Sequence, residues 1–236
     1  RTPHGRRLDL TFEARKNETP HTLFLRQWQV KYSWAVLLND RRLGRLATID
    51  TRLVHDLPIP KGLLRDGTNK LSIVAPKATD DIEVGDFWIA PGPRKTALGQ
   101  AWIEVSVRDA IPCRITVTDE KGHLAALHSG QAAPLALRPG VAYTGNGSAQ
   151  LGVLPGRYTV YASRGFEYSV AQKQVTVAVG ETAVVPLEIR REVPTPNLVA
   201  CDTHIHTLTF SGHGDSTANC GQTSPTTAVN IPSISR

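Results

Sequence analysis

The sequence predicts an all-β protein with two tandem antiparallel β-sandwiches, followed by a lone strand and an irregular C-terminal tail. Apolar and polar residues alternate over many short stretches, and successive side chains of a strand face opposite sides. Glycine, proline, asparagine and aspartate divide these stretches, and such residues favour turns. The length of 236 residues allows two small domains. We expect sandwiches at residues 7–90 and 99–192, and a third segment at 197–236.

Alternation in the first domain is clearest in LFLRQWQVKYSWAV, residues 23–36. Over residues 27–34 of this stretch, apolar residues at even positions alternate with polar ones, which favours a strand with one buried face. Turn residues follow in NDRRLG and RDGTN, and strand-like stretches resume in KLSIV and DIEVGDFWI. Several short strands separated by turns predict a sandwich or a jelly roll.

The stretches WAVLLNDRRLGRL and LPIPKGLLRDGTNKLSIV resemble galactose-binding-like jelly rolls, which are accessory modules of carbohydrate-active and related enzymes. The resemblance implies that a glycan could be a partner, through exposed aromatic rings. The candidates are Trp28, Tyr32, Trp34 and Trp88. All four lie at even-numbered positions, and alternate residues of a strand face the same side of a sheet. We therefore expect these rings to fill the core instead of binding sugar. Asp80 and Asp81 could help to hold a calcium ion, although a solvated acidic turn is the favoured interpretation.

Between the domains, APGPRKTALG at residues 90–99 contains two prolines and two glycines and predicts a linker. Alternation restarts after it. Valines on both sides of Gly180 and Glu181 predict a closing hairpin at 173–192. The stretch SRGFEYSVAQK interrupts the alternation, so we expect a bend there whose Phe166 and Tyr168 contact the next domain.

Three stretches of the second domain occur in the order typical of one family. VSVRDAIPCRITVTDEKG, LPGRYTVYASRGFEYSV and VTVAVGETAVVPLEI resemble the carboxypeptidase-regulatory-like, or transthyretin-like, domain. This resemblance implies an immunoglobulin- or transthyretin-like sandwich that acts mostly as a structural spacer attached to an enzyme. It implies no catalytic residue in this domain.

Composition excludes several classes of function. The net charge of +6 is mild and the arginines are scattered, so we expect no nucleic-acid partner. No apolar run approaches the roughly 20 residues of a membrane helix, so we expect no membrane span. Cys113, Cys201 and Cys220 form no C-x-x-C pair, which argues against a disulfide framework. The chain starts at Arg1 and contains no methionine, so we expect a processed or partial product, and an extracytoplasmic location is suggested by its accessory domains alone.

The stretch LVACDTHIH predicts a strand on which Asp202, His204 and His206 share one face. Neighbours on that face lie roughly 6 to 7 Å apart. Two imidazoles at this spacing can bind one divalent ion, and Asp202 could orient a ring or act as a ligand itself. The competing interpretation is that these histidines are surface or capping residues.

The motif DTHIHT, followed by SGHGD, resembles the first motif of PHP-type metallohydrolases, the polymerase-and-histidinol-phosphatase superfamily. Amidohydrolases are the looser match, and the domain order resembles the CehA/McbA-type branch. The resemblance implies His204 and His206 as ligands to Zn, Mn or Fe, with Asp202 supporting and His213 as a further ligand. It also implies hydrolysis of a small-molecule ester by metal-activated water, a phosphoester being the default substrate.

The remaining ligands of such a site are not found in this sequence. A barrel of this family needs roughly 200 more residues, whereas 197–236 contains no acidic residue after Asp215 and no histidine after His213. We therefore expect the truncated start of a hydrolase domain, with no catalytic residue, no hydrolysis by this chain alone and weak metal binding at best. The alternative function is a non-enzymatic carbohydrate- or protein-binding β-sandwich module.

Overall fold

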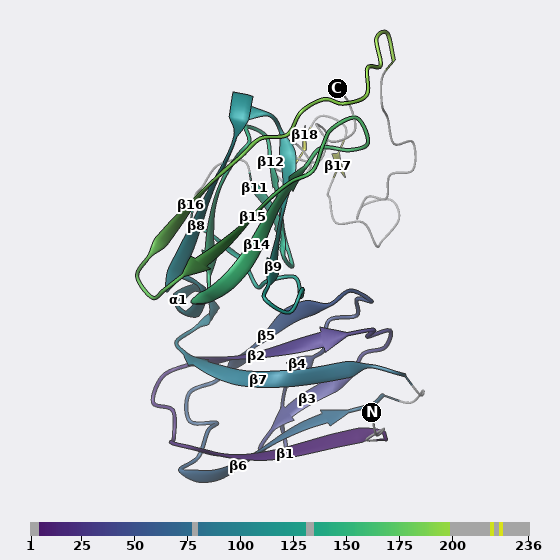
Figure 1. The fold of residues 1–236 in the computed structure, drawn as a ribbon. Coiled ribbons are helices and arrows are strands. Elements are labelled where there is room, and N and C mark those ends of the chain that lie inside the picture. Colours follow the sequence, from purple (N-terminus) through teal and green to yellow (C-terminus); the bar gives the residue numbers. More distant parts are fainter. Residues whose placement is uncertain (1–4, 77–79, 131–134, 199–217, 220–221, 224–236) are drawn as a thin grey trace. The chain divides into compact units, whose positions relative to one another are not determined.

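A computed structural model describes most of the chain and confirms the all-β class with tandem β-sandwiches (Figure 1). The described residues are 5–76, 80–130, 135–198, 218–219 and 222–223. They belong to two compact units, the first spanning 1–98 with 122–126, and the second spanning 99–121 with 127–236. No helix in the described part of the chain is long and apolar enough to cross a membrane.

The first unit is a sandwich of a four-stranded and a three-stranded sheet, in the orders β1-β6-β3-β4 and β5-β2-β7. All strand pairs in both sheets are antiparallel. The strands are β1 (Arg7–Ala14), β2 (His21–Trp28), β3 (Ala35–Leu38), β4 (Arg41–Arg45), β5 (Leu53–Ile59), β6 (Gly67–Val74) and β7 (Glu83–Pro91).

Strand register places the apolar residues of the first unit on facing surfaces. Leu23 of β2 pairs with Leu57 on one side and Ile89 on the other; Leu23 and Leu57 belong to the buried core cluster, and the partly buried Ile89 packs against it. On the other sheet, Val36 pairs with Ile73 in the same cluster. Burying each such side chain contributes about 1.5–3 kcal/mol, so the two apolar faces hold this sandwich together.

The alternating stretch 23–36 is not one strand, contrary to the prediction. β2 ends at Trp28, Gln29 has a left-handed φ of 58°, and β3 begins only at Ala35. The carboxylate of Asp80 holds the intervening segment, because one of its oxygens accepts hydrogen bonds from the Lys31 and Tyr32 amides at 3.1 and 3.2 Å. The same oxygen accepts one from the Trp34 ring nitrogen at 3.1 Å.

This break separates the four aromatic residues, so the expectation that all four fill the core is wrong. Trp34 is 5% exposed and lies in the core cluster, whereas Tyr32 is 47% exposed. Trp28 and Trp88 are half-buried on the opposite face of their sheet from Leu23 and Ile89. Residues at alternate positions share a face only while the chain stays in one strand. This strand ends before Gln29.

The predicted linker at 90–99 is also wrong in part, because α1 (Arg94–Leu98) forms there. Ala97 and Leu98 are fully buried, and α1 packs against β2 and β7. Arg94 donates two hydrogen bonds of 2.9 Å to the carboxylate of Asp56 on β5. The Pro93 carbonyl accepts hydrogen bonds from the Thr96 and Ala97 amides, and the fixed φ of proline suits the start of a helix, so Pro93 helps to begin α1.

The second unit contains two further sheets, in the orders β10-β13-β8-β16 and β11-β12-β9-β14-β15. Its described strands are β8 (Ala101–Val107), β9 (Cys113–Asp119), β10 (His128–Ser129), β11 (Leu135–Arg138), β12 (Val141–Thr144), β13 (Ser148–Val153), β14 (Gly156–Ser163), β15 (Ala171–Val177) and β16 (Thr182–Leu187). Two short paired strands, β17 (Ala218–Asn219) and β18 (Gln222–Thr223), lie further along the chain.

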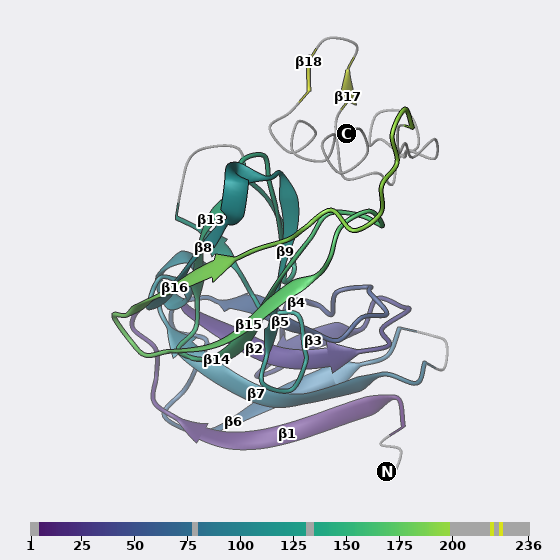
Figure 2. The same ribbon diagram turned by 45° about the horizontal axis from the view of Figure 1, so that its top comes forward.

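The predicted closing hairpin does not form, and the second sandwich is not wholly antiparallel. β15 pairs with β14, whereas β16 pairs in parallel with β8, so the two strands belong to different sheets (Figure 2). The chain turns between them at Gly180, whose φ is 79°. Val177 and Val185 both face the interior. Valine alternation predicts the buried face of each strand but not its partner.

Candidate functional site

The predicted metal ligands Asp202, His204, His206 and His213 lie outside the described residues. Their shared face therefore stays a prediction. Within the described part of the chain, no group of three or more histidine, cysteine, aspartate or glutamate residues could hold a metal ion. The described residue that comes closest to the motif in sequence is Leu198, at the end of the segment that leaves the second sandwich.

Two segments of the second unit are hydrogen-bonded to each other just before this point. We call residues 164–170, between β14 and β15, the bend, and residues 188–198, after β16, the connector. The Ser169 amide donates to the Arg190 carbonyl at 2.8 Å, and Tyr168 forms an antiparallel bridge with Arg191. The Glu167 carbonyl accepts hydrogen bonds from the amides of residues 192 and 193, at 2.8 and 3.2 Å. The connector is therefore attached along its backbone.

Side chains strengthen this attachment. The Glu167 carboxylate pairs with the Arg191 guanidinium at 2.8 Å and also accepts a hydrogen bond from the Thr195 hydroxyl. Both contacts lower the pKa of Glu167 below its ordinary value. The hydrogen bond from Thr195 has the larger effect and the one from Arg191 the smaller. We call Glu167, Arg191 and Thr195 the clamp. It links the bend to the connector three residues before Leu198.

The bend is also anchored at its start. Arg164 donates a hydrogen bond of 2.7 Å to the Pro112 carbonyl, just before β9. Its guanidinium lies 5.4 Å from the centre of the Tyr168 ring, and the Arg191 guanidinium lies 6.0 Å from the same ring. Such cation–π contacts are favourable within about 6 Å. The half-buried Tyr168 ring is thus held in contact with both the bend and the connector.

In contrast to the half-buried Tyr168, Phe166 is fully exposed within the described part of the chain. Gly165, with a φ of 67°, turns the chain immediately before it. Three further apolar residues on the same two segments are exposed, and we call the four together the bend surface. Its members are Phe166, Val170, Val193 and Leu198. The interruption of alternation at Gly165 was the sequence signal for this surface, and contact with a following domain stays a prediction.

The two half-buried tryptophans of the first unit, Trp28 and Trp88, are each in contact with other side chains. The Arg52 guanidinium lies 4.1 Å from the centre of the Trp28 ring. The Trp88 ring stacks on Phe24, with centroids 5.7 Å apart and planes 13° from parallel, and Arg26 lies 5.4 Å from it. Both tryptophans are therefore engaged by neighbours within their own unit.

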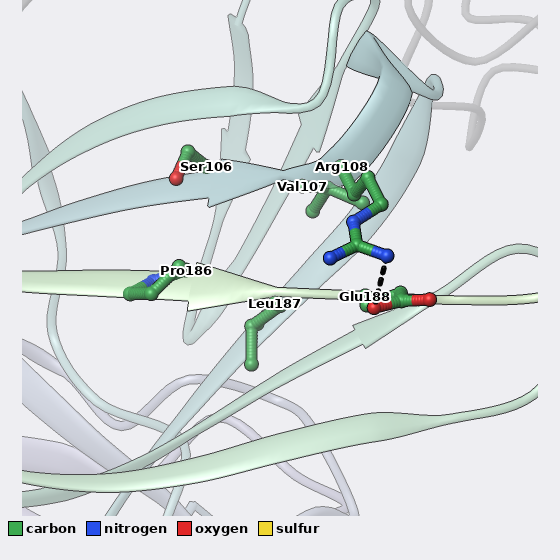
Figure 3. Close-up of a pocket in the computed structure, with 6 residues that line it drawn as sticks. All are labelled: Ser106, Val107, Arg108, Pro186, Leu187 and Glu188. Atoms are coloured by element: carbon green, nitrogen blue, oxygen red, sulfur yellow. Dashed lines mark ion pairs between the residues drawn. The ribbon is translucent and has the colours of Figure 1, made fainter.

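A shallow depression of about 430 Å³ lies where β8 and β16 end (Figure 3). Arg108 reaches across it to Glu188, and the two side chains form an ion pair at 2.8 Å. Glu188 also accepts a hydrogen bond from Arg190, which lowers its pKa. The residues that line the depression are Ser106, Val107, Arg108, Pro186, Leu187 and Glu188. Ser106 has no histidine beside it among these six, so the lining does not form a nucleophile–base pair.

Comparison with known proteins does not identify a family. No family model matches the chain, and no curated protein matches it. Among solved structures, the chain resembles the Bacillus anthracis TIE protein at 11% identity and a TM-score of 0.29, covering 80% of this chain and 38% of that chain. It also resembles GBS52, the minor pilin of Streptococcus agalactiae, at 13% identity and a TM-score of 0.33, covering 80% of this chain and 98% of that chain.

The clamp can be tested by limited proteolysis, because Arg190 and Arg191 are trypsin sites within the connector. Substituting Glu167→Gln removes the charge that pairs with Arg191. We expect trypsin at pH 8 to cut after these arginines several-fold faster in the variant than in the unchanged protein. The control is Glu181→Gln, which alters a carboxylate in the turn between β15 and β16. Equal cleavage rates in all three proteins would show that the clamp does not hold the connector.

Proposed function

We propose that this chain is a non-enzymatic β-sandwich module that binds protein through the bend surface. The observation that carries the proposal is the fully exposed ring of Phe166 on a bend that is tied to its own sandwich. Aromatic residues are enriched at the centres of protein interfaces, where one large side chain fills a pocket of the partner. Burying a phenylalanine ring contributes about 1.5–3 kcal/mol.

The attachment of the bend favours binding because little order has to be gained on contact. The carbonyl of Glu167 and the amide of Ser169 are already hydrogen-bonded to the connector. A partner would then meet Phe166 on a backbone that is already fixed, and the entropy lost on association is smaller for a preorganised surface. Arg164 and Tyr168 extend this support to the rest of the sandwich.

The bend surface suits protein better than carbohydrate. Its other three members are the aliphatic residues Val170, Val193 and Leu198, whereas sugar binding needs exposed aromatic rings together with polar groups. The tryptophans that could supply such rings, Trp28 and Trp88, are stacked against arginine or phenylalanine. These contacts favour the protein-binding form of the proposal over the carbohydrate-binding form.

A second proposal is that the segment after Leu198 begins a metal-dependent hydrolase domain. It rests on the motif DTHIHT, in which two imidazoles and a carboxylate are spaced as ligands. These donors suit a borderline ion such as Zn²⁺, and Mn²⁺ or Fe²⁺ less strongly. When bound, the ion would polarise an ester and activate water. In this proposal His204 and His206 would hold the ion, and Asp202 would orient one of the rings.

The protein-binding proposal predicts that a bound protein partner covers position 166. Replacing Phe166 by the photoreactive analogue p-benzoylphenylalanine keeps an aromatic ring at the same site. On irradiation we expect a crosslink to a peptide, identified by mass spectrometry, and no change when a panel of glycans is added. The matched control carries the analogue at Val184, an exposed residue of β16. A yield at 166 no higher than at 184 would refute protein binding by this surface.

The hydrolase proposal predicts weak metal binding by this chain, because one histidine pair and one carboxylate give fewer ligands than a closed four-coordinate zinc site. Calorimetric titration with Zn²⁺ or Mn²⁺ should give a dissociation constant above about 1 μM. A dissociation constant of that size corresponds to a binding free energy of roughly −8 kcal/mol. The residual heat should disappear when His204→Ala and His206→Ala are combined. A stoichiometric site of micromolar affinity or tighter, lost in that double variant, would contradict weak binding.

A further inference from the structure

We infer that two copies of this chain associate through β1, with their two β1 strands paired antiparallel. This surface belongs to the first unit, so the inference goes beyond the proposed function of the bend surface. β1 is the terminal strand of its four-stranded sheet, and within the described part of the chain β6 is its only paired neighbour (Figure 2). A terminal strand leaves one row of backbone N–H and C=O groups unpaired, and such a row can pair with a strand of another molecule.

The other terminal strands of six or more residues in the described sheets carry features that hinder such pairing. β5 and β16 contain Pro58 and Pro186, which lack an amide hydrogen. β7 has an irregular register with β2 beside the left-handed Asp86. β15 places Lys173 opposite the buried Val160, on the core-facing side. β1 contains no proline, and its register with β6 is unbroken over all eight residues.

The backbone of β1 presents alternate residues to the free edge. The Ala75 amide donates a hydrogen bond of 2.9 Å to the Arg6 carbonyl. Because the direction of backbone groups alternates along a strand, the even-numbered residues direct theirs to β6. The odd-numbered residues therefore direct theirs to the free edge, and they are Arg7, Asp9, Thr11 and Glu13.

Charge selects one register for the two copies. Residues directly opposite each other in an antiparallel pair lie on the same face of the sheet. With Leu10 opposite the second copy's Leu10, Arg7 faces Glu13 and Asp9 faces Thr11 across the exposed face. Shifting one strand by two residues would place Asp9 opposite Asp9 in one direction and opposite Glu13 in the other. Like charges directly opposite each other are destabilising, so the register centred on Leu10 is favoured.

The same register brings apolar side chains together on the other face. Leu8 meets the second copy's Phe12, and Leu10 meets its own counterpart. All three side chains are only half-buried where they pack against the core cluster of the first unit. Pairing would remove more of their surface from water, which favours association.

The two charged side chains that meet across the pair keep hydrogen-bonding atoms for each other. The Nε atom of Arg7 donates to the Asp9 carboxylate, and one terminal nitrogen of Arg7 donates to the Ser72 hydroxyl. A guanidinium has five N–H donors, so others remain. One oxygen of Glu13 accepts a hydrogen bond of 2.6 Å from Thr68, and the carboxylate has a second oxygen.

Disulfide trapping in the full chain tests the inference. Leu10→Cys is introduced together with Cys201→Ser and Cys220→Ser, which remove competing thiols. Cys113 does not interfere, because it is buried and burial raises its pKa to about 12. Opposite residues whose backbone groups point away from the partner strand have Cα atoms about 4.5 Å apart, a distance that a disulfide spans. Under mild oxidation we expect a disulfide-linked dimer.

The matched control is Leu8→Cys in the same background, because Leu8 is also half-buried on the same face of β1. In the inferred register its counterpart is four residues away along the strands, roughly 13 Å. We expect trapping at position 10 to be at least about tenfold faster than at position 8 at the same protein concentration, a ratio that corresponds to about 1.4 kcal/mol.

A second variant tests the free edge itself. Thr11→Pro removes an amide that points away from β6, so it leaves the pairing within the sheet intact. It should slow trapping at position 10 by at least about tenfold, whereas Thr11→Val should not. Equal trapping at positions 8 and 10, or a rate at position 10 that Thr11→Pro does not change, would overturn the inference. Photocrosslinking at position 166 reports on the bend surface separately, so failure of either proposal is distinguishable from failure of the other.

Discussion

The ion pair and hydrogen bond made by the Glu167 carboxylate determine where the chain leaves the second sandwich. Without them, the connector after β16 would be joined to the bend through its backbone, Ser169 and the contact of Arg191 with the Tyr168 ring. Arg191 and Thr195 bring it against Glu167 instead. The hydrogen bonds from Thr195 and Arg191 lower the pKa of Glu167, so its carboxylate stays charged to a lower pH than that of an ordinary glutamate. These contacts stabilise the folded form above the ordinary carboxyl pKa and are lost as the pH falls through the lowered one.

This constraint connects the fold to the two proposals. The bend interrupts the alternation of β14 and β15, and its backbone accepts and donates the hydrogen bonds that fix the connector. Phe166 can then stay in solvent at a defined place, because the bend is held by its neighbours Glu167 and Tyr168. The same contacts position Leu198, the described residue that precedes the predicted metal-binding motif. A protein-binding module and the support of a following domain are therefore compatible functions of one surface.

The sequence predicted the class of the fold and the bend, but not the strand partners or the clamp. Alternation is a local property, so it correctly predicted buried faces for residues such as Val177 and Val185. The parallel pairing of β16 with β8 joins residues about eighty positions apart, and no local pattern contains it. No sequence signal at Gln29 indicates its left-handed φ. The even positions of Tyr32 and Trp34 therefore wrongly suggested that both side chains face the core. The clamp depends on Glu167 and Arg191 meeting across the bend, which spacing alone does not show.

Native-state hydrogen exchange at the amides of Glu192 and Val193 tests the attachment of the connector most directly. Both amides donate to the Glu167 carbonyl, at 2.8 and 3.2 Å. Hydrogen-bonded amides exchange only when the structure opens. We expect both to exchange at least about a hundredfold more slowly than in an unstructured peptide at neutral pH, which corresponds to an opening free energy of roughly 2.8 kcal/mol or more. Exchange at the unstructured rate would show that the connector is free and would contradict the account.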